Sequence, residues 1–480
     1  MSARYLTTTL PYVNADPHIG HALEFVQTDV LARAWRAQGD EVFFNTGTDE
    51  HGQKIYEAAE KAGQDVHAYA DYYADEFRKL GTALNLSNDA FIRTIEPRHY
   101  AAAAEMWRRC DRAGDIYKKA YTGMYCVGCE SFKTEKEVAD GHCVIHTSLQ
   151  LQEITEENYF FRFSKYASQL LDYLSRPDVI IPEWRKEEAI AFVKNGLEDF
   201  SISREESRLS WGVPVPGDDT QVMYVWFDAL TNYISTLGWP EDSEGTFKKY
   251  WEEGRVVQMA GKDQVRFQSL MWQAMLMSAG IKNTDQIFYH GFITSGGQKM
   301  SKSLGNVISP YELVNKYGTD ATRYILLRHI NPMEDSDVTW ERLDEWYTAN
   351  LTNGLGNLVA RVMKLSEDYA VTTLHVKSTR PSSLSSQIKG AVEAFRFNDA
   401  MDFIWSNVQR LDRRINEEEP YKVIKTDPVM GKAMIQTLVS DLREIREALI
   451  PFMPQTAAKI LDSVRTNKKP ENLFPRLLTK

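Results

Sequence analysis

The sequence predicts an α/β fold, in which a doubly wound, Rossmann-like parallel sheet carries a small cysteine-bearing insertion and is followed by an α-helical bundle. Three observations support this fold class. A strand–helix–strand pattern fills the first fifty residues, residues 116–150 are rich in Cys, Gly and Lys, and the pattern after residue 345 is helical. A strand–helix–strand unit of this length is the usual beginning of a parallel sheet.

The opening unit is predicted from its apolar spacing. Residues 4–10 are rich in β-branched and aromatic side chains and predict a strand, as do residues 41–45. Between them, residues 19–38 place apolar side chains at helical intervals. Because ligands of such sheets bind at the carboxyl ends of the strands, residues 9–12 and 48–51 are expected to lie at a binding site.

The remaining elements follow from the same patterns. They are helices over residues 159–174 and 182–197, strands over 221–228 and 256–259, a Gly- and Ser-rich loop over 295–310 and a Ser-rich inter-helix loop over 377–386. Five parts are predicted: the first half of the sheet domain (1–115), the insertion (116–220), the second half of the sheet domain (221–290), a linker with the Gly-rich loop (291–345) and the helical bundle (346–480).

Composition and charge exclude several classes of protein. The 480 residues are 43% hydrophobic and 26% charged, so the chain is neither disordered nor collagen-like. It has no run of about 18 apolar residues and no signal peptide, which predicts a cytoplasmic protein without membrane contact. The net charge of −11 argues against a non-specific nucleic-acid binder. Residues 351–480, however, carry 20 basic and 15 acidic side chains, which suits a module that contacts a polyanion or reflects ordinary surface variation.

A first candidate site follows the opening strand, in Pro17-His18-Ile19-Gly20-His21. Backbone N–H groups at a helix start, two imidazoles and a glycine that allows close approach favour a phosphate site. Two histidines three residues apart could instead form a metal pair or lie on the surface.

A second candidate site is Lys299-Met300-Ser301-Lys302-Ser303, in the Gly-rich loop. Two ammonium groups flanked by hydroxyls suit a leaving pyrophosphate. Solvated loop charges are the alternative.

A third candidate site joins Cys126, Cys129, Cys143 and His146. Two tight pairs of soft ligands separated by a loop have the spacing of a tetrahedral zinc knuckle. These four residues would fill all four positions of a tetrahedral zinc ion and leave none for water, which predicts one structural Zn²⁺ per chain. Free cysteines or a redox pair are the alternative.

Together, the first two motifs resemble the paired signatures of class I aminoacyl-tRNA synthetases, in the same order along the chain. Four further segments narrow the resemblance to the methionyl-tRNA synthetase family, and it covers essentially the whole chain. These segments are Thr9-Leu10-Pro11-Tyr12, Thr46-Gly47-Thr48-Asp49-Glu50-His51-Gly52, Tyr224-Val225-Trp226-Phe227-Asp228-Ala229 and Gly261-Lys262-Asp263.

The resemblance implies a role for each matching residue. Catalysis falls to His18, His21, Lys299 and Lys302, and ATP binding to His18, Gly20, His21, Gly261, Asp263 and Lys302. Methionine binding falls to Leu10, Tyr12, Asp49, Trp226, Leu230, Tyr233 and Gln268, and anticodon binding to Asn357, Arg361 and Tyr421.

Some of these assignments have alternatives or depart from the family. Asp49 could be a helix N-cap, and Trp226 and Tyr233, seven residues apart, also have plain core spacing. Gln268 stands where the family usually has a His, so this position cannot be protonated. Tyr421 stands where the family usually has a Trp and offers less area for stacking.

The implied reaction is the ATP-dependent attachment of L-methionine to tRNA(Met), including initiator tRNA, through a methionyl-adenylate. Mg²⁺ is expected with ATP, and a monomer is expected because the chain ends at Lys480 without the extra C-terminal domain of dimeric relatives. The alternatives are a class I synthetase for another small amino acid, a nucleotidyltransferase that does not use tRNA, and a tRNA-binding paralogue without activity.

Overall fold

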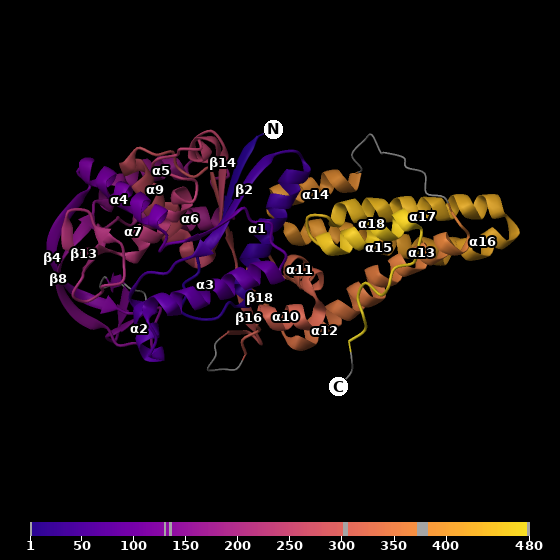
Figure 1. Cartoon of the computed structure of the whole chain (residues 1–480), viewed down its shortest axis with the longest axis horizontal. Coiled ribbons are helices and arrows are strands. Elements are labelled where there is room, and N and C mark those ends of the chain that lie inside the picture. The colour runs from indigo at the N-terminus through magenta and orange to yellow at the C-terminus, as the bar shows by residue number, and fades with distance from the viewer. Residues whose placement is uncertain (1, 129–130, 134–136, 301–305, 372–382, 478–480) are drawn as a thin grey trace. The chain divides into compact units, whose positions relative to one another are not determined.

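The computed structural model describes residues 2–128, 131–133, 137–300, 306–371 and 383–477 (Figure 1). The chain forms two compact units, each assembled from segments that are discontinuous in the sequence. The first unit comprises Met1–Asp16, Asp40–Lys79 and Asn88–Tyr289, and the second comprises Pro17–Gly39, Leu80–Ser87 and His290–Lys480. The five-part division of the sequence stays a prediction.

A six-stranded sheet forms the centre of the first unit, in the order β3-β2-β1-β14-β15-β9. Its strands are β1 (Ala3–Thr7), β2 (Glu41–Thr48), β3 (Ala90–Arg93), β14 (Arg255–Gly261), β15 (Gln286–His290) and β9 (Ile180–Ile181). The pairs β3–β2, β2–β1, β1–β14 and β15–β9 are parallel, which confirms the predicted fold class. Since the chain runs outward from β1 to β3 and returns at β14, the topological switch point lies between β1 and β14.

Aromatic side chains fill the core of this unit. Tyr5 in β1 is fully buried, as expected of a parallel strand covered on both faces. Its ring packs at 6.0 Å against Trp251, which packs edge-on at 6.0 Å against Trp272. The helices of the unit are α2 (Gln53–Ala62), α4 (Pro97–Arg112), α5 (Ala167–Leu174), α6 (Glu183–Lys194), α7 (Val225–Leu230), α8 (Asn232–Ser235) and α9 (Trp272–Ala279), and α3 (Val66–Ala83) begins in it.

A long antiparallel ribbon of β4 (Ile116–Cys126) and β8 (Gln152–Phe161) dominates the predicted insertion (Figure 1). The register runs from the pair Ile116–Phe161 to the pair Tyr125–Gln152. Shorter strands accompany it: β5 (Ser131–Lys133), β6 (Val138–Ala139), β7 (His142–Cys143), β10 (Phe200–Ser201), β11 (Ser203–Glu205), β12 (Pro214–Val215) and β13 (Asp218–Met223).

Two sequence predictions in the first unit are wrong in part. Residues 159–161 belong to strand β8 and not to a helix, because they pair with the beginning of β4. The predicted strand over 221–228 is strand only to Met223, and helix α7 follows from Val225. Both segments are short, apolar and aromatic, a pattern that does not separate strand from buried helix.

The second unit is mainly helical. It contains α1 (Ile19–Ala37), α10 (Pro310–Tyr317), α11 (Thr319–Arg328), α12 (Trp340–Trp346), a π-helical stretch (Tyr347–Gly356), α13 (Asn357–Asp368), α14 (Ser383–Glu393), α15 (Phe397–Glu418), α16 (Pro420–Thr426), α17 (Pro428–Leu449) and α18 (Pro454–Thr466). A small sheet has the order β17 (Gln298–Lys299), β16 (Ile293–Ser295) and β18 (Ser336–Asp337). Residues 383–386, predicted as loop, begin α14.

A buried ion pair fixes α1 against α11 in this unit. The Arg323 guanidinium lies 2.7 Å from Asp29, and both side chains are fully buried. Arg323 also donates to the carbonyls of Phe452, Leu84 and Pro451. These bonds compensate much of the cost of burying two charges.

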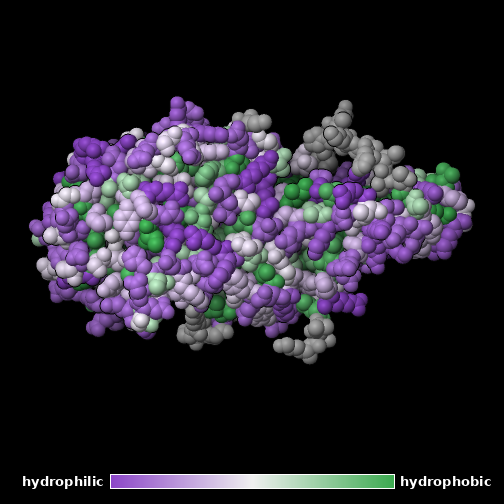
Figure 2. Space-filling view, in the orientation of Figure 1, coloured by the Kyte–Doolittle hydropathy of each residue, from purple (hydrophilic) through white to green (hydrophobic). Residues whose placement is uncertain are grey.

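No helix within the described residues is both long enough and apolar enough to cross a bilayer. The face drawn in Figure 2 is mostly hydrophilic, with hydrophobic residues in small groups.

Candidate functional site

The carboxyl end of β2 is held rigidly from several sides. Glu50 accepts two hydrogen bonds from the Arg93 guanidinium, at 2.7 and 2.6 Å, and one from Thr48 at 2.6 Å. The backbone N–H of Asp49 donates to the carbonyl of Pro11 at 3.0 Å, which joins this strand end to residue 12. Asp49, at 3% exposure, is therefore a carboxylate with a fixed backbone at the carboxyl end of β2, the edge at which sheets of this topology bind ligands.

The alternative role of Asp49 as an N-cap is not supported for the next helix. The residue that caps α2 is Gly52, and no side chain makes the capping hydrogen bond there. Capping of α2 therefore does not explain why a carboxylate stands at position 49.

Three aromatic rings form a continuous wall near Asp49. Tyr12 meets Trp226 edge-on at 5.9 Å, and Trp226 stacks on Phe267 at 3.9 Å with 12° between the ring planes. Trp226 is only half-buried, so it differs from the core tryptophans. Its Nε1 has no hydrogen-bond partner among the described residues. The wall offers ring faces and edges to an apolar, polarizable ligand group.

Gln268 follows the wall residue Phe267 in the chain and is hydrogen-bonded to Tyr233. The Gln268 amide nitrogen donates to the Tyr233 hydroxyl at 3.1 Å, and both side chains are buried. The amide oxygen of Gln268 has no partner among the described residues and can accept a hydrogen bond. Leu230 is buried on α7, and Leu10 is half-buried after β1.

Phe267 was not identified from the sequence. It begins a π-helical turn over Phe267–Met271, which also carries Gln268. Such turns add one residue to a helix and recur at functional sites. The sequence around Phe267 does not indicate that its ring stacks on Trp226, because Trp226 lies 41 positions earlier in the chain.

The two histidines of the first motif, in the second unit, form a reciprocal cap at the start of α1. His18 Nδ1 accepts from the backbone of Gly20 at 3.1 Å, and His21 Nδ1 accepts from the backbone of His18 at 3.2 Å. The rings stack at 3.6 Å. Because both Nδ1 atoms are acceptors, each neutral ring carries its proton on Nε2, which is a donor. Burial and the nearby His18 lower the pKa of His21 well below its usual value.

The close approach of the His18 ring explains why glycine suits position 20. A Cβ at this position would lie 3.0 Å from the His18 ring, so a side chain would press on the folded-back imidazole. The glycine therefore allows His18 to cap the helix.

The other predicted nucleotide-binding residues are placed separately. Gly261 ends β14 at the switch point, and Asp263 is exposed in the short helical turn Lys262–Gln264 that follows. In the second unit, Lys299 ends β17 and pairs with Thr294. Lys302 lies outside the described residues.

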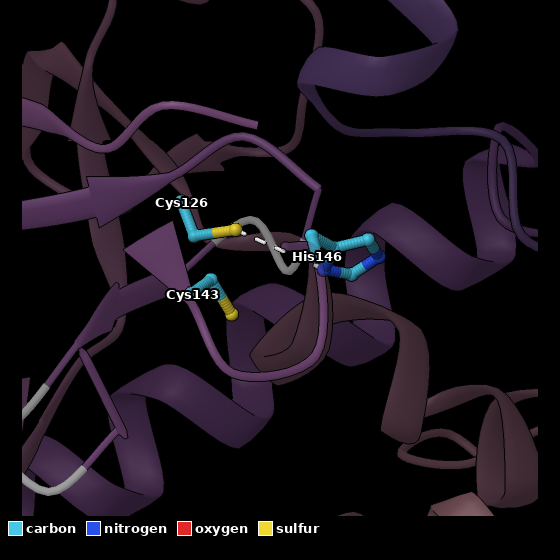
Figure 3. Close-up of side chains that lie close together, drawn as sticks. All are labelled: Cys126, Cys143 and His146. Atoms are coloured by element: carbon cyan, nitrogen blue, oxygen red, sulfur yellow. Dashed lines mark hydrogen bonds between the residues drawn. The ribbon is translucent and has the colours of Figure 1, made fainter. Parts of the chain in front are cut away.

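The structure brings three of the four predicted metal ligands together. The ligand atoms of Cys126, Cys143 and His146 lie within 4.8 Å of one another, and the side chains point toward one another (Figure 3). Cys126 Sγ is 3.8 Å from His146 Nδ1. Tetrahedral zinc with bonds of about 2.3 Å to sulfur and 2.0–2.1 Å to nitrogen would separate such atoms by roughly 3.6 Å, so these residues fit the metal. Cys129 lies outside the described residues.

The backbone around this cluster also suits a metal-bound thiolate. The N–H of Ile145 donates to Cys143 Sγ at 3.4 Å. A Cβ at Gly128 would lie 2.6 Å from the His146 ring, so only glycine lets the imidazole close over this turn.

The three predicted anticodon residues lie in the helical part of the second unit. Asn357 is exposed at the start of α13, and Arg361 lies one turn later. The Arg361 guanidinium donates to Asp412 and Asn416 on α15, both at 2.6 Å. Tyr421, half-buried on α16, donates to Glu419 at 3.0 Å.

A polar network that the sequence analysis missed lies in the first unit. Asp228 is fully buried and lies 2.6 Å from His51 and 2.5 Å from His99. These three residues are far apart in the chain, so no motif spacing identifies them as neighbours.

Known proteins resemble this chain over its length. A family model described as tRNA synthetases class I (M) matches residues 4–153 and 133–363. The methionine–tRNA ligase of Fusobacterium nucleatum is 38% identical over 483 residues, covering 98% of this chain and 75% of that relative. The Brucella suis enzyme of the same name is 40% identical over 472 residues, covering 95% and 91%.

Solved structures give the same result. Mycobacterium tuberculosis methionyl-tRNA synthetase in complex with methionyl-adenylate matches with a TM-score of 0.90 and 36% identity, covering 100% of this chain and 99% of that one. Its apo form matches with a TM-score of 0.84 and 33% identity. The chain therefore belongs to the class I tRNA synthetases, within the methionine–tRNA ligase family.

Proposed function

We propose that this protein activates L-methionine with ATP and attaches it to tRNA(Met), including initiator tRNA, through a methionyl-adenylate. One observation carries the choice of substrate. A buried carboxylate, Asp49, lies at the strand edge beside an aromatic wall that contains Tyr12 and Trp226. This combination suits a ligand with an ammonium group and a polarizable apolar side chain.

In the proposed site, each group has a defined task. Asp49 accepts hydrogen bonds from the α-ammonium of methionine. Trp226 and Tyr12 contact the thioether sulfur, an attraction of about 0.3–1.5 kcal/mol per aromatic contact. Gln268 stands where the family usually has His, and its amide, bonded to Tyr233, keeps the same position polar at every pH. Leu10 and Leu230 complete the apolar lining.

Activation requires the methionine carboxylate to attack the α-phosphorus of ATP while pyrophosphate leaves. His18 and His21 present Nε2–H donors to phosphate oxygens, and Lys299 and Lys302 stabilise the departing charge. Gly261 and Asp263 contact the nucleoside, with the Asp263 carboxylate on the ribose. Mg²⁺ bound to ATP would neutralise phosphate charge.

The zinc site supports the fold of the insertion and takes no part in the chemistry. Cys126, Cys129, Cys143 and His146 would hold one Zn²⁺, leaving no position for water. A small strand cluster with few buried apolar residues depends on such a bond for its stability.

Transfer to tRNA completes the reaction. The ribose hydroxyl of the terminal adenosine attacks the activated carbonyl, and AMP leaves. Asn357 and Arg361 would read base edges, and Tyr421 would stack on an anticodon base. Asp412 and Asn416 hold the Arg361 guanidinium in one orientation before tRNA arrives. We also propose that the protein is a cytoplasmic monomer.

Pyrophosphate exchange into ATP, measured with each of the twenty amino acids, tests this function. Exchange that depends on methionine alone supports it. Exchange with another small amino acid would assign a different class I specificity, and no exchange with any amino acid would leave tRNA binding without catalysis.

A further inference from the structure

The buried network around Asp228 consists of five polar side chains. The Asp228 carboxylate lies 2.6 Å from His51 Nδ1 and 2.5 Å from His99 Nε2. The second nitrogen of His51 lies 3.0 Å from the Tyr100 hydroxyl, and that of His99 lies 3.0 Å from the Ser235 hydroxyl. All these residues except Tyr100 are buried.

One arrangement of protons satisfies every member of this network. Both histidines donate to Asp228, which accepts only, and their other nitrogens accept from Tyr100 and Ser235. Burial raises the pKa of Tyr100 to about 12, so its hydroxyl keeps the proton it donates. Burial raises the pKa of Asp228, but the two histidines outweigh this effect and lower it to about 2, so it is ionised at neutral pH.

The network members alternate with residues of the proposed methionine site. His51 follows Asp49 by two residues, and Ser235 follows Tyr233 by two residues. Asp228 itself lies two residues after Trp226 and two before Leu230, on the same short helix α7. Each of these network residues therefore anchors the chain two positions away from a residue that we propose contacts methionine.

Helix α7 buries Phe227 and Leu230 in the hydrophobic core, and it is also held by the hydrogen bonds of Asp228. It spans six residues, and no side chain caps its N-terminus. A helix this short is not stable on its own. The bonds from Asp228 to His51, after β2, and to His99, on α4, tie it to two larger elements.

We propose that Asp228 is a positioning residue for methionine binding. By accepting from His51 and His99, it holds the helix that carries Trp226 at a fixed place relative to the strand end that carries Asp49. This inference rests on the proposed function, and it adds a residue that does not itself touch the substrate. Binding groups need placement to within about 0.5 Å, so loss of the anchor should weaken methionine binding.

The variant Asp228→Asn tests the proposal. Asn keeps the shape but offers one acceptor and one donor group, so one of the two histidines loses its acceptor. We expect the methionine KM in pyrophosphate exchange to rise roughly ten- to hundredfold, while the ATP KM changes less than about threefold.

A matched control is Asp115→Asn, in the same unit. Asp115 is also fully buried and accepts hydrogen bonds from Lys165, Tyr166 and Ser278, but it lies in no proposed site. Both variants should lower the thermal unfolding midpoint, and only Asp228→Asn should raise the methionine KM. Equal KM effects in the two variants would overturn the proposal and make Asp228 a residue of general stability.

A second pair of variants avoids removing the buried charge. In His99→Gln, the amide nitrogen takes the place of Nε2 and keeps the bond to Asp228, whereas His99→Asn places its nitrogen at the Nδ1 position and loses that bond. We expect Gln to keep a methionine KM close to that of the unchanged protein and Asn to raise it. Equal values for both would contradict the proposal.

The unchanged protein separates this inference from the proposed function. If it shows no methionine-dependent exchange, the proposed function fails and the inference fails with it. If exchange is normal and Asp228→Asn leaves the methionine KM unchanged, the inference alone is wrong.

Discussion

Replacing Asp49 by Asn removes one charge and almost nothing else. The side chain is only 3% exposed, and its backbone is fixed by the bond to the Pro11 carbonyl, so Asn should occupy the same place. A charge-assisted hydrogen bond contributes about 1.5–3 kcal/mol, which is roughly a ten- to 150-fold change in binding. Because water screens a buried carboxylate weakly, we expect the upper half of this range.

The assay is pyrophosphate exchange with methionine and ATP varied in turn. Asp49→Asn should raise the methionine KM by this factor and the ATP KM by less than about threefold. Asp40→Asn is the matched control, because Asp40 lies at the opposite end of β2 and pairs with Arg4 at 2.8 Å. A similar rise in both KM values, or no rise in either, would refute the role of Asp49 as the ammonium-binding group.

Three further predictions concern the metal, the Gly-rich loop and the helical bundle. Elemental analysis should find about one zinc per chain, and full activity of a metal-free native protein would contradict the zinc site. Lys302→Ala should slow single-turnover adenylate formation about 10²–10³-fold with little change in methionine KM, whereas a loss under about fivefold would indicate a solvated loop charge. Tyr421→Ala should weaken aminoacylation by about 1–3 kcal/mol and leave adenylate formation intact. An equal loss in both steps would make Tyr421 a residue of the fold.

Local patterns were sufficient to predict the framework of the sheet. The apolar run around Tyr5, the helical spacing from Ile19 and the run from Val256 are all confirmed as β1, α1 and β14. Each of these apolar patterns lies within one short continuous segment, so its periodicity can be read from the sequence. The predicted helix over 159–174 failed at its start because Phe161 pairs with Ile116, 45 positions away.

The candidate site was predictable only where motifs are contiguous. Asp49 and Trp226 both lie in segments that resemble the family, whereas the stacking of Phe267 on Trp226 depends on how two distant helices meet. The Asp228–His99 bond spans 129 positions. Neither contact leaves a periodic trace in the sequence, because each joins two residues that lie far apart in the chain.

Methionine-specific charging of tRNA is best tested in the complete reaction. The purified protein is incubated with ATP, labelled methionine and a tRNA(Met) transcript, and the aminoacyl ester on the terminal adenosine is counted. We expect ester formation that requires ATP and falls sharply when the anticodon of the transcript is changed. Adenylate formation without transfer to tRNA, or charging with an amino acid other than methionine, would contradict it.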